Sequence, residues 1–305
     1  PQGGADTDLQ SAGADNAAPN GGEYVDLDGD GLADGVAYDT NNDGQIDALE
    51  IDTTGNDQTD TVFVDGGRAA DHTLSAEHAA AMVREHRPHV VFLASPNNPT
   101  GTALDLATIE AVYAAQAQNE AAGGPGAMVV VDEAYAEFAL AGTRSALTLL
   151  PGRERLIVAR TMSKAFALAG ARLGYLAADP AVADALRLVR LPYHLSAVTQ
   201  ATAEAALDHV DALLRTVEDI KAQRDRIVST LRGLGLRPSV SDSNFVFFGH
   251  LEDASDVWRR LLDRGVLVRD VGIPHHLRVT AGTEPETTAF LTALEEVLGE
   301  TGHRS

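Results

Sequence analysis

The sequence predicts an α/β fold in which a large domain is built on a mostly parallel sheet and a smaller α+β domain follows it. Short unbroken apolar runs alternate with helical segments from about residue 76 onwards. This alternation is typical of a parallel sheet covered by helices on both faces. The chain has 305 residues, of which 44 % are hydrophobic, and this is enough for a sizeable core in one large or two medium domains.

The expected elements of the large domain follow one another in a regular order. We expect helices over 75–86 and 106–122. The expected strands are the apolar runs at 89–94, 127–131, 156–160 and 173–178. The resulting domain prediction is a large domain at 67–195, a connecting helical segment at 196–233 and a small C-terminal domain at 234–305.

The first part of the chain differs in composition from the rest. The formal net charge is −22, and residues 1–75 hold 17 Asp and Glu against a single basic residue, Arg68. This excess of acid argues against nucleic acid as a partner. Residues 1–22 are mostly Gly, Ala, Asp, Asn and Gln with a single Leu, so we expect a disordered tail there.

Within the segment 23–66, residues 26–64 repeat a 13-residue pattern as DLDGDGLADGVAY, DTNNDGQIDALEI and DTTGNDQTDTVFV. Each unit has oxygen-bearing side chains at alternate positions and ends in a short run with β-strand character. Alternating oxygen ligands around a tight turn suit Ca²⁺. The candidate ligands are Asp26, Asp28, Asp30 and Asp34 in the first unit, and Asp39, Asn41, Asp43, Asp47 and Glu50 in the second. The units resemble calcium repeats of the thrombospondin type 3 kind; the alternative is an acidic linker that binds nothing tightly.

Several classes of protein are disfavoured. The chain contains no cysteine, so it has neither disulfides nor thiolate metal sites. No apolar run approaches the roughly 18 residues of a membrane span, so no membrane partner is expected. The first residues show no basic segment leading into an apolar one. We therefore expect a cytoplasmic protein, although Asp-rich repeats would fit an extracellular setting.

Polar residues follow three of the expected strands. The first strand runs into SPNNPTG at 95–101, the second into DEAY at 132–135 and the third into TMSK at 161–164. Functional groups in α/β sheets collect at the carboxyl ends of strands. We therefore expect one crevice to contain the side chains Asn98, Asp132, Tyr135, Ser163 and Lys164.

This set of groups matches the needs of a pyridoxal phosphate site. A lysine must form a Schiff base with the cofactor aldehyde. A carboxylate must lie against the pyridine nitrogen so that the ring can act as an electron sink. Hydroxyls and an arginine suit the phosphate, because a planar guanidinium matches its oxygens. Lysine is among the residues that are least often buried, so a lysine within a run of small and apolar residues is unusual. The alternative to a reactive amine is that Lys164 is an ordinary surface lysine.

Four motifs, SPNNPTG, DEAYAEF, TMSKAFALAGARLGY and LRVTAG, resemble the signatures of fold type I, class I/II aminotransferases. Their combination is most similar to the histidinol-phosphate aminotransferases of actinobacteria, over roughly residues 76–305. The resemblance implies a homodimer that uses pyridoxal 5'-phosphate to transaminate histidinol phosphate, the amino donor, with 2-oxoglutarate, a 2-oxo acid, in histidine biosynthesis.

The resemblance also implies roles for individual residues. Lys164 would form the Schiff base and move the proton. The implied cofactor contacts are Asp132 for the pyridine nitrogen, Asn98 and Tyr135 for the ring hydroxyl, and Thr161, Ser163 and Arg172 for the phosphate. Arg278 would bind the substrate carboxylate. Arg269 would bind the substrate phosphate, or else it is only a solvated charge at a strand end.

The sequence departs from the family upstream of SPNNPTG. Only 94 residues precede Ser95, and the first 65 or so are acidic tail and repeats. We find no match there for the family's phosphate-binding glycine turn or for the aromatic residue that stacks on the pyridine ring. We therefore expect a large domain that is incomplete at its N-terminus. The alternative function is an inactive aminotransferase-derived scaffold fused to calcium-binding repeats.

Overall fold

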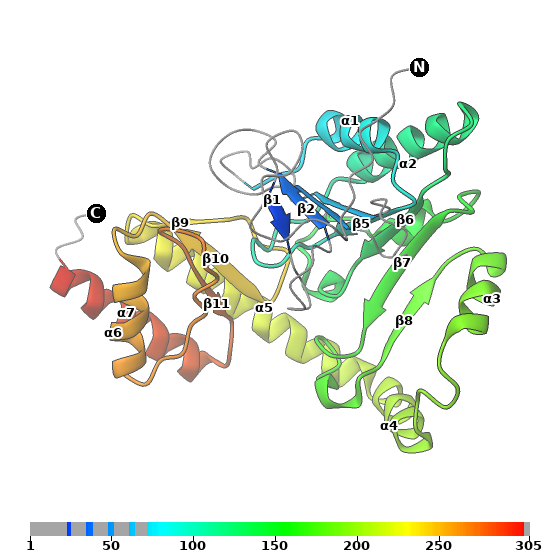
Figure 1. The fold of residues 1–305 in the computed structure, drawn as a ribbon. Coiled ribbons are helices and arrows are strands. Elements are labelled where there is room, and N and C mark those ends of the chain that lie inside the picture. The colour runs from blue at the N-terminus through cyan, green and yellow to red at the C-terminus, as the bar shows by residue number, and fades with distance from the viewer. Residues whose placement is uncertain (1–22, 26–34, 39–47, 52–60, 65–71, 302–305) are drawn as a thin grey trace.

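A computed structural model describes residues 23–25, 35–38, 48–51, 61–64 and 72–301 (Figure 1). The larger sheet has eight strands in the order β1 to β8. Its strands are β1 (Glu23–Val25), β2 (Gly35–Tyr38), β3 (Ala48–Ile51), β4 (Thr61–Val64), β5 (Val90–Ala94), β6 (Met128–Asp132), β7 (Leu156–Thr161) and β8 (Gly174–Ala177). Three of the four expected apolar runs, β5, β6 and β7, are parallel to one another as predicted, and β4 pairs with β5 in parallel. The fourth run, β8, is antiparallel to β7, and the pairings from β1 to β4 are also antiparallel.

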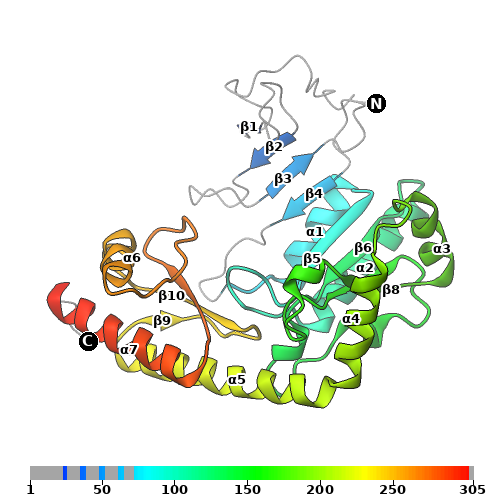
Figure 2. The same cartoon turned by 90° about the horizontal axis from the view of Figure 1, so that it is seen from below.

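The strand-like ends of the three repeats are strands in the structure. GVAY, ALEI and TVFV form β2, β3 and β4, which pair side by side and antiparallel. The last of them, β4, then pairs in parallel with β5 of the large domain. The strands of the repeats and those of the large domain therefore belong to one sheet (Figure 2).

Helices cover one face of this sheet. The helices α1 (Ala76–His86) and α2 (Leu106–Ala121) pack on each other and on the face formed by alternate strand residues such as Val129 and Val131, both buried. The opposite face is different, because Phe92 is 46 % exposed and Leu176 is 42 % exposed. The expectation of helices on both faces is therefore wrong for the part of the chain that is described.

The described helices that follow β8 do not cover that second face. None of the residues of α3 (Pro180–Val189) is buried, and α4 (Ala197–Asp208) buries only Ala203. The next helix, α5 (Val210–Gly233), is long and runs from the large domain to the small one (Figure 2). The expected helical segment is thus two helices that meet at His209.

The small domain has its own core. Its three strands are β9 (Arg237–Pro238), β10 (Phe245–Gly249) and β11 (Leu277–Thr280), with β10 in the middle and antiparallel to both neighbours. The helices α6 (Ala254–Asp263) and α7 (Glu284–Thr301) pack with α5 around these strands. Every residue of β10 is buried.

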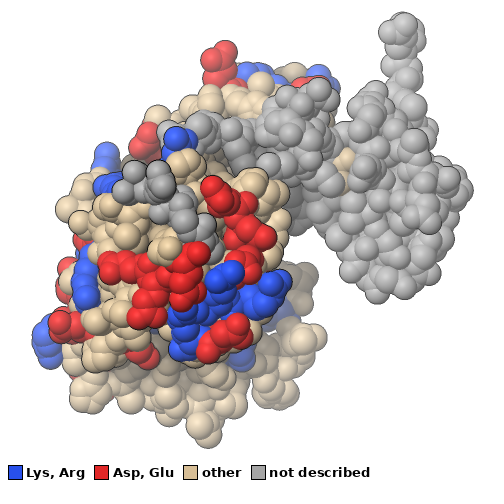
Figure 3. Space-filling model, turned by 90° about the vertical axis from the view of Figure 1, so that its left-hand side faces the viewer, with Lys and Arg blue, Asp and Glu red and all other residues tan. Residues whose placement is uncertain are grey.

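Charged side chains of both signs lie close together on the outer face of this small domain (Figure 3). Arg264 of the α6 C-terminus pairs with Glu300 of α7 at 2.6 Å, and Arg260 pairs with Asp256 at 2.6 Å. Exposed pairs of this kind contribute little to stability. Among the described helices, none combines the length and apolarity that crossing a membrane requires.

Candidate active site

The carboxyl ends of β5, β6 and β7 lie next to one another, as the sequence predicts. Asp132 pairs with Ala94 on one side and with Ala159 on the other. The backbone N–H of Ser95 donates to the Asp132 carbonyl at 2.9 Å, so the loop after β5 begins beside the end of β6. The three polar segments therefore start from one edge of the sheet.

The loop at 95–101 is held by short-range hydrogen bonds and by the small domain. Asn97 donates through its side chain to Thr100 at 3.0 Å. Gly101 has a φ of +80°, and a Cβ atom there would lie 2.7 Å from the Ser241 hydroxyl. Glycine is required because both the backbone conformation and the close approach exclude a side chain. The exposed Asn98 lies within this loop, and its Oδ1 accepts from the Arg278 guanidinium.

A row of aromatic and cationic groups connects Lys164 to the small domain. The Lys164 Nζ lies 5.1 Å from the centroid of the Tyr135 ring. Tyr135 meets Phe245 edge to face at 5.3 Å, and the Arg278 guanidinium lies 4.8 Å from the Phe245 ring. Such cation–π and aromatic contacts are attractive. Lys164, Tyr135 and Arg278, with Asn98 bonded to Arg278, therefore share one region.

The amine of Lys164 is accessible. The residue is exposed, and in the described part of the chain its Nζ forms no hydrogen bond or ion pair. The whole sequence has only one other lysine, Lys221, whose Nζ pairs with Glu218 at 2.9 Å. Lys164 is thus an exposed amine with no acidic partner among the described residues.

Asp132 is also exposed, and one of its oxygens is used locally. Its Oδ1 accepts from the backbone N–H of Ala134 at 3.0 Å, which stabilises the turn that follows β6. Its Oδ2 forms no hydrogen bond within the described residues. Asp132 and Lys164 form no ion pair with each other there, so the structure places both groups at the same edge of the sheet without joining them.

The proposed phosphate-binding residues lie on two segments that are bonded together. The Ser163 N–H donates to the Thr161 hydroxyl at 3.1 Å, and Thr161 pairs with Gly174 on β8. A Cβ atom on Gly174 would lie 2.8 Å from the Arg160 carbonyl, so the close approach of the two strands requires glycine. Arg172 is exposed, with a φ of 50°, and donates to the Ala169 carbonyl at 3.1 Å.

Arg278 and Arg269 are direct neighbours. Their backbones exchange hydrogen bonds of 2.8 and 2.9 Å in an antiparallel bridge. Burial lowers the pKa of Arg278, the charge of Arg269 lowers it further, and Tyr135 opposes the shift. Arg278 Nε is buried and has no hydrogen-bond partner among the described atoms. Two cations side by side, one with an unused donor, are suited to binding an anion.

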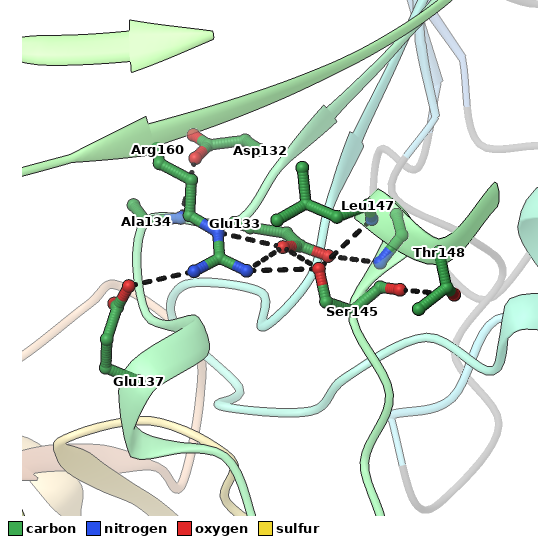
Figure 4. A network of polar contacts seen from close by, with 9 residues as sticks. Asp132, Glu133, Ala134, Glu137, Ser145, Leu147, Thr148 and Arg160 are labelled. Atoms are coloured by element: carbon green, nitrogen blue, oxygen red, sulfur yellow. Dashed lines mark hydrogen bonds and ion pairs between the residues drawn. The ribbon is translucent and has the colours of Figure 1, made fainter. Parts of the chain in front are cut away.

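The sequence did not identify Phe245 as part of this region. It also did not identify the polar network of Glu133, Glu137, Ser145 and Arg160, which lies next to Asp132 at the ends of β6 and β7 (Figure 4). The signal for the network was available in DEAYAEF, which holds two acidic residues besides Asp132, and in LIVAR, which ends in a cation.

Most of the expected calcium ligands lie outside the described residues. These are Asp26, Asp28, Asp30, Asp34, Asp39, Asn41, Asp43 and Asp47. Glu50 lies in β3, but its side chain is also outside the described part. Elsewhere, the described residues contain no group of three or more His, Cys, Asp or Glu side chains that could hold a metal ion.

Comparison with known proteins identifies the family. Residues 58–294 match the family described as aminotransferase class I and II, which is more than half of the chain. The chain belongs to this family. The matched aminotransferase region begins within the third repeat and includes β4 to β11.

Comparison with individual proteins of the family finds histidinol-phosphate aminotransferases among the similar ones. The chain is 67 % identical over 244 residues to a histidinol-phosphate aminotransferase of Paenarthrobacter aurescens, covering 80 % of this chain and 64 % of that protein. It is 62 % identical over 236 residues to one of Frankia casuarinae, covering 77 % and 58 %. The solved histidinol-phosphate aminotransferase of Sinorhizobium meliloti in complex with pyridoxal-5'-phosphate is 30 % identical, with a TM-score of 0.66, covering 76 % and 63 %. The chain therefore spans less than two thirds of these aminotransferases.

Proposed function

We propose that this chain binds pyridoxal 5'-phosphate at Lys164 and transaminates histidinol phosphate with 2-oxoglutarate. The observation that carries the proposal is the position of Lys164 over the Tyr135 ring, in contact through Phe245 with Arg278. High identity to histidinol-phosphate aminotransferases over most of this chain supports the choice of substrate.

The residues present fit the cofactor. Among the described residues, the Lys164 amine and one carboxylate oxygen of Asp132 have no hydrogen-bond partner, and these are the two groups that an aldehyde and a pyridine nitrogen require. We propose that Asn98 and Tyr135 hold the ring hydroxyl. The proposed phosphate ligands are Thr161, Ser163 and Arg172. The bound cofactor would supply an electron sink for the loss of the substrate α-proton.

The remaining chemistry belongs to the side chains of the protein. We propose that the Lys164 Nζ takes the α-proton and returns it, because a flexible amine beside the reacting carbon can act as both base and acid. Arg278, whose Nε has no hydrogen-bond partner among the described atoms, would orient a substrate carboxylate. Arg269, exposed beside it, would hold the phosphate of the substrate.

We also propose that two copies of the chain associate and that the enzyme works in the cytoplasm. The dimer is supported by apolar side chains that α3 and the segment after it leave exposed. Leu188 is 87 % exposed, Leu191 is 75 % exposed and Tyr193 is 99 % exposed. These three exposed side chains fall within six consecutive residues, and apolar groups exposed close together mark interaction surfaces.

A coupled assay of transamination tests the proposal. Purified protein with pyridoxal phosphate, histidinol phosphate and 2-oxoglutarate is expected to form glutamate, and Lys164→Ala is expected to abolish it. Lys221→Ala is the matched control, because it removes the other lysine without touching the site. No glutamate from the parent protein would favour the alternative function, an inactive scaffold joined to calcium-binding repeats.

A further inference from the structure

A largely buried ionic network lies next to Asp132, a proposed cofactor ligand, at the ends of β6 and β7 (Figure 4). Arg160 donates to Glu133 through Nη2 at 2.7 Å and through Nε at 3.0 Å. Its Nη1 donates to Glu137 at 2.9 Å, and Nη2 also reaches the Ser145 hydroxyl at 3.0 Å. Glu133 in turn accepts from the Ser145 hydroxyl at 2.7 Å and from the Ala146 N–H at 2.6 Å.

Two members of the network are adjacent in sequence to proposed cofactor ligands. Glu133 follows Asp132 at the end of β6, and Arg160 precedes Thr161 at the end of β7. Successive strand residues point to opposite faces. The network therefore lies on the helix-covered side of the sheet, while Asp132 and Thr161 lie on the other side. The Glu133 N–H donates to the Ala159 carbonyl at 2.9 Å and so joins the two strand ends.

The network is more polar than stability alone would require. The side chains of Arg160, Glu133 and Glu137 are only 13, 4 and 12 % exposed, and two carboxylates face one guanidinium. Burial by itself lowers the pKa of Arg160, but the hydrogen bond and charge of Glu133, with the charge of Glu137, raise it overall. Apolar residues of similar volume often replace buried ion pairs without loss of stability. The charged groups of the network are explained if they fix the positions of the segments that carry them. A planar guanidinium suits this role, because it can donate to three acceptors in fixed directions.

We propose that Glu133 and Arg160 are positioning residues that hold Asp132 and Thr161 in place for the cofactor. The network joins β6, β7, the turn η3 (Ala136–Phe138) and the turn η4 (Ala146–Leu149) at the point where the cofactor ligands leave the sheet. This inference rests on the proposed function, because it needs a cofactor that contacts those two ligands.

The test compares the affinities for pyridoxal phosphate and for pyridoxal in the apoprotein of the 305-residue chain, measured by absorbance titration. In metal sites, residues that orient the direct ligands are worth about 10- to 100-fold in affinity. We expect Arg160→Met to weaken the binding of pyridoxal phosphate by a factor of that order and the binding of pyridoxal by less. The two ligands differ because Arg160 adjoins Thr161, a proposed ligand of the phosphate that pyridoxal lacks. Arg160→Lys, which keeps the charge but lacks the fork, is expected to restore only part of the loss.

The matched control is Arg155→Met. Arg155 adjoins the other end of β7 and pairs with Glu120 at 2.6 Å, with both side chains more exposed. We expect the control to keep both affinities. If Arg160 had a purely structural role, Arg160→Met would lower the affinities for both ligands by the same factor. That result would overturn the proposal, and so would equal affinities in Arg160→Met and Arg155→Met.

A second measurement separates this inference from the proposed function. If the parent protein binds neither ligand, the proposed function fails. Amide hydrogen exchange of the apoprotein then tests by itself whether the network holds the ends of β6 and β7. We expect faster exchange at residues 132–135 and 160–163 in Arg160→Met and parent-like exchange in Arg155→Met. Equal exchange in the two variants would show that the network does not hold the strand ends.

Discussion

Asp242 connects the small domain to the loops of the proposed active site, and replacing it should destabilise the protein measurably. Asp242 is 5 % exposed and lies between β9 and β10. Its Oδ1 accepts from the Leu140 N–H at 2.9 Å and from the Thr143 hydroxyl at 2.6 Å. Its own N–H donates to the Gly101 carbonyl at 2.7 Å. The side-chain bonds are the part that a substitution removes.

The magnitude follows from those two bonds. A hydrogen bond to a charged group contributes about 1.5–3 kcal/mol. Because both bonds share one oxygen, we expect Asp242→Ala to lower the free energy of unfolding by about 3 kcal/mol rather than by the full sum. Asp242→Asn keeps an oxygen acceptor and is expected to lose about 1 kcal/mol. With an m-value of about 3 kcal/mol/M in urea, Asp242→Ala shifts the midpoint by about 1 M.

The assay is urea unfolding followed by tryptophan fluorescence. The chain has a single tryptophan, Trp258 on α6, whose indole N–H donates to the Val268 carbonyl at 3.0 Å. The fluorescence therefore reports on the small domain. The control is Asp184→Ala, which removes an exposed pair with Arg187 and should cost less than about 1 kcal/mol. The reasoning is refuted if Asp242→Ala shifts the midpoint no more than the control does, or if Asn is as damaging as Ala.

Three further predictions concern other parts of the chain. The backbone N–H and hydroxyl of Thr283 donate to Glu286, each at 2.7 Å, and lower its pKa below the ordinary 4.5. The resulting stabilisation is present above the unfolded-state pKa and is lost as the pH falls through the lower folded-state pKa. Glu286→Gln should therefore flatten the fall in the free energy of unfolding in that acidic range. An unchanged dependence of this free energy on pH contradicts the prediction. Calcium at about millimolar concentration should release or absorb heat on binding the parent protein, and much less on binding Asp39→Ala; no heat with the parent leaves the repeats as a linker. Tyr193→Asp should shift sedimentation from dimer to monomer because Tyr193 is 99 % exposed; a variant that sediments like a dimeric parent, or a parent that is monomeric, refutes the proposed interface.

The sequence predicted the strand ends well because the chemistry there is local. An apolar run followed by a polar motif identifies both a buried strand and its carboxyl end, and Asp132 and Thr161 lie where that pattern places them. The strand-like ends of the repeats were identified for the same reason, since GVAY, ALEI and TVFV are β2, β3 and β4.

The rest of the site depends on contacts between distant segments. Phe245 contacts Tyr135 and Arg278 only because the small domain is docked beside the loop that holds Asn98. Nothing in the run NFVFF indicates which phenylalanine makes that contact. The pairing of Arg160 with Glu133 likewise requires the register of β6 against β7.

The exposed second face of the sheet could not be predicted from composition. An unbroken run such as AMVVV is expected whether helices cover one face of a strand or both faces. In the structure Val129 and Val131 are buried while Phe92, on the neighbouring strand, is 46 % exposed. Which face is covered depends on where the helices pack, and the strand sequence does not record it.

Reductive trapping of the cofactor tests the central claim most directly. The protein is incubated with pyridoxal phosphate, reduced with borohydride, digested and analysed by mass spectrometry. Because the chain has only two lysines, the proposal predicts the cofactor mass on the peptide that contains Lys164 and little on the peptide that contains Lys221. Equal labelling of both peptides, or none at Lys164, would contradict a cofactor site at this position.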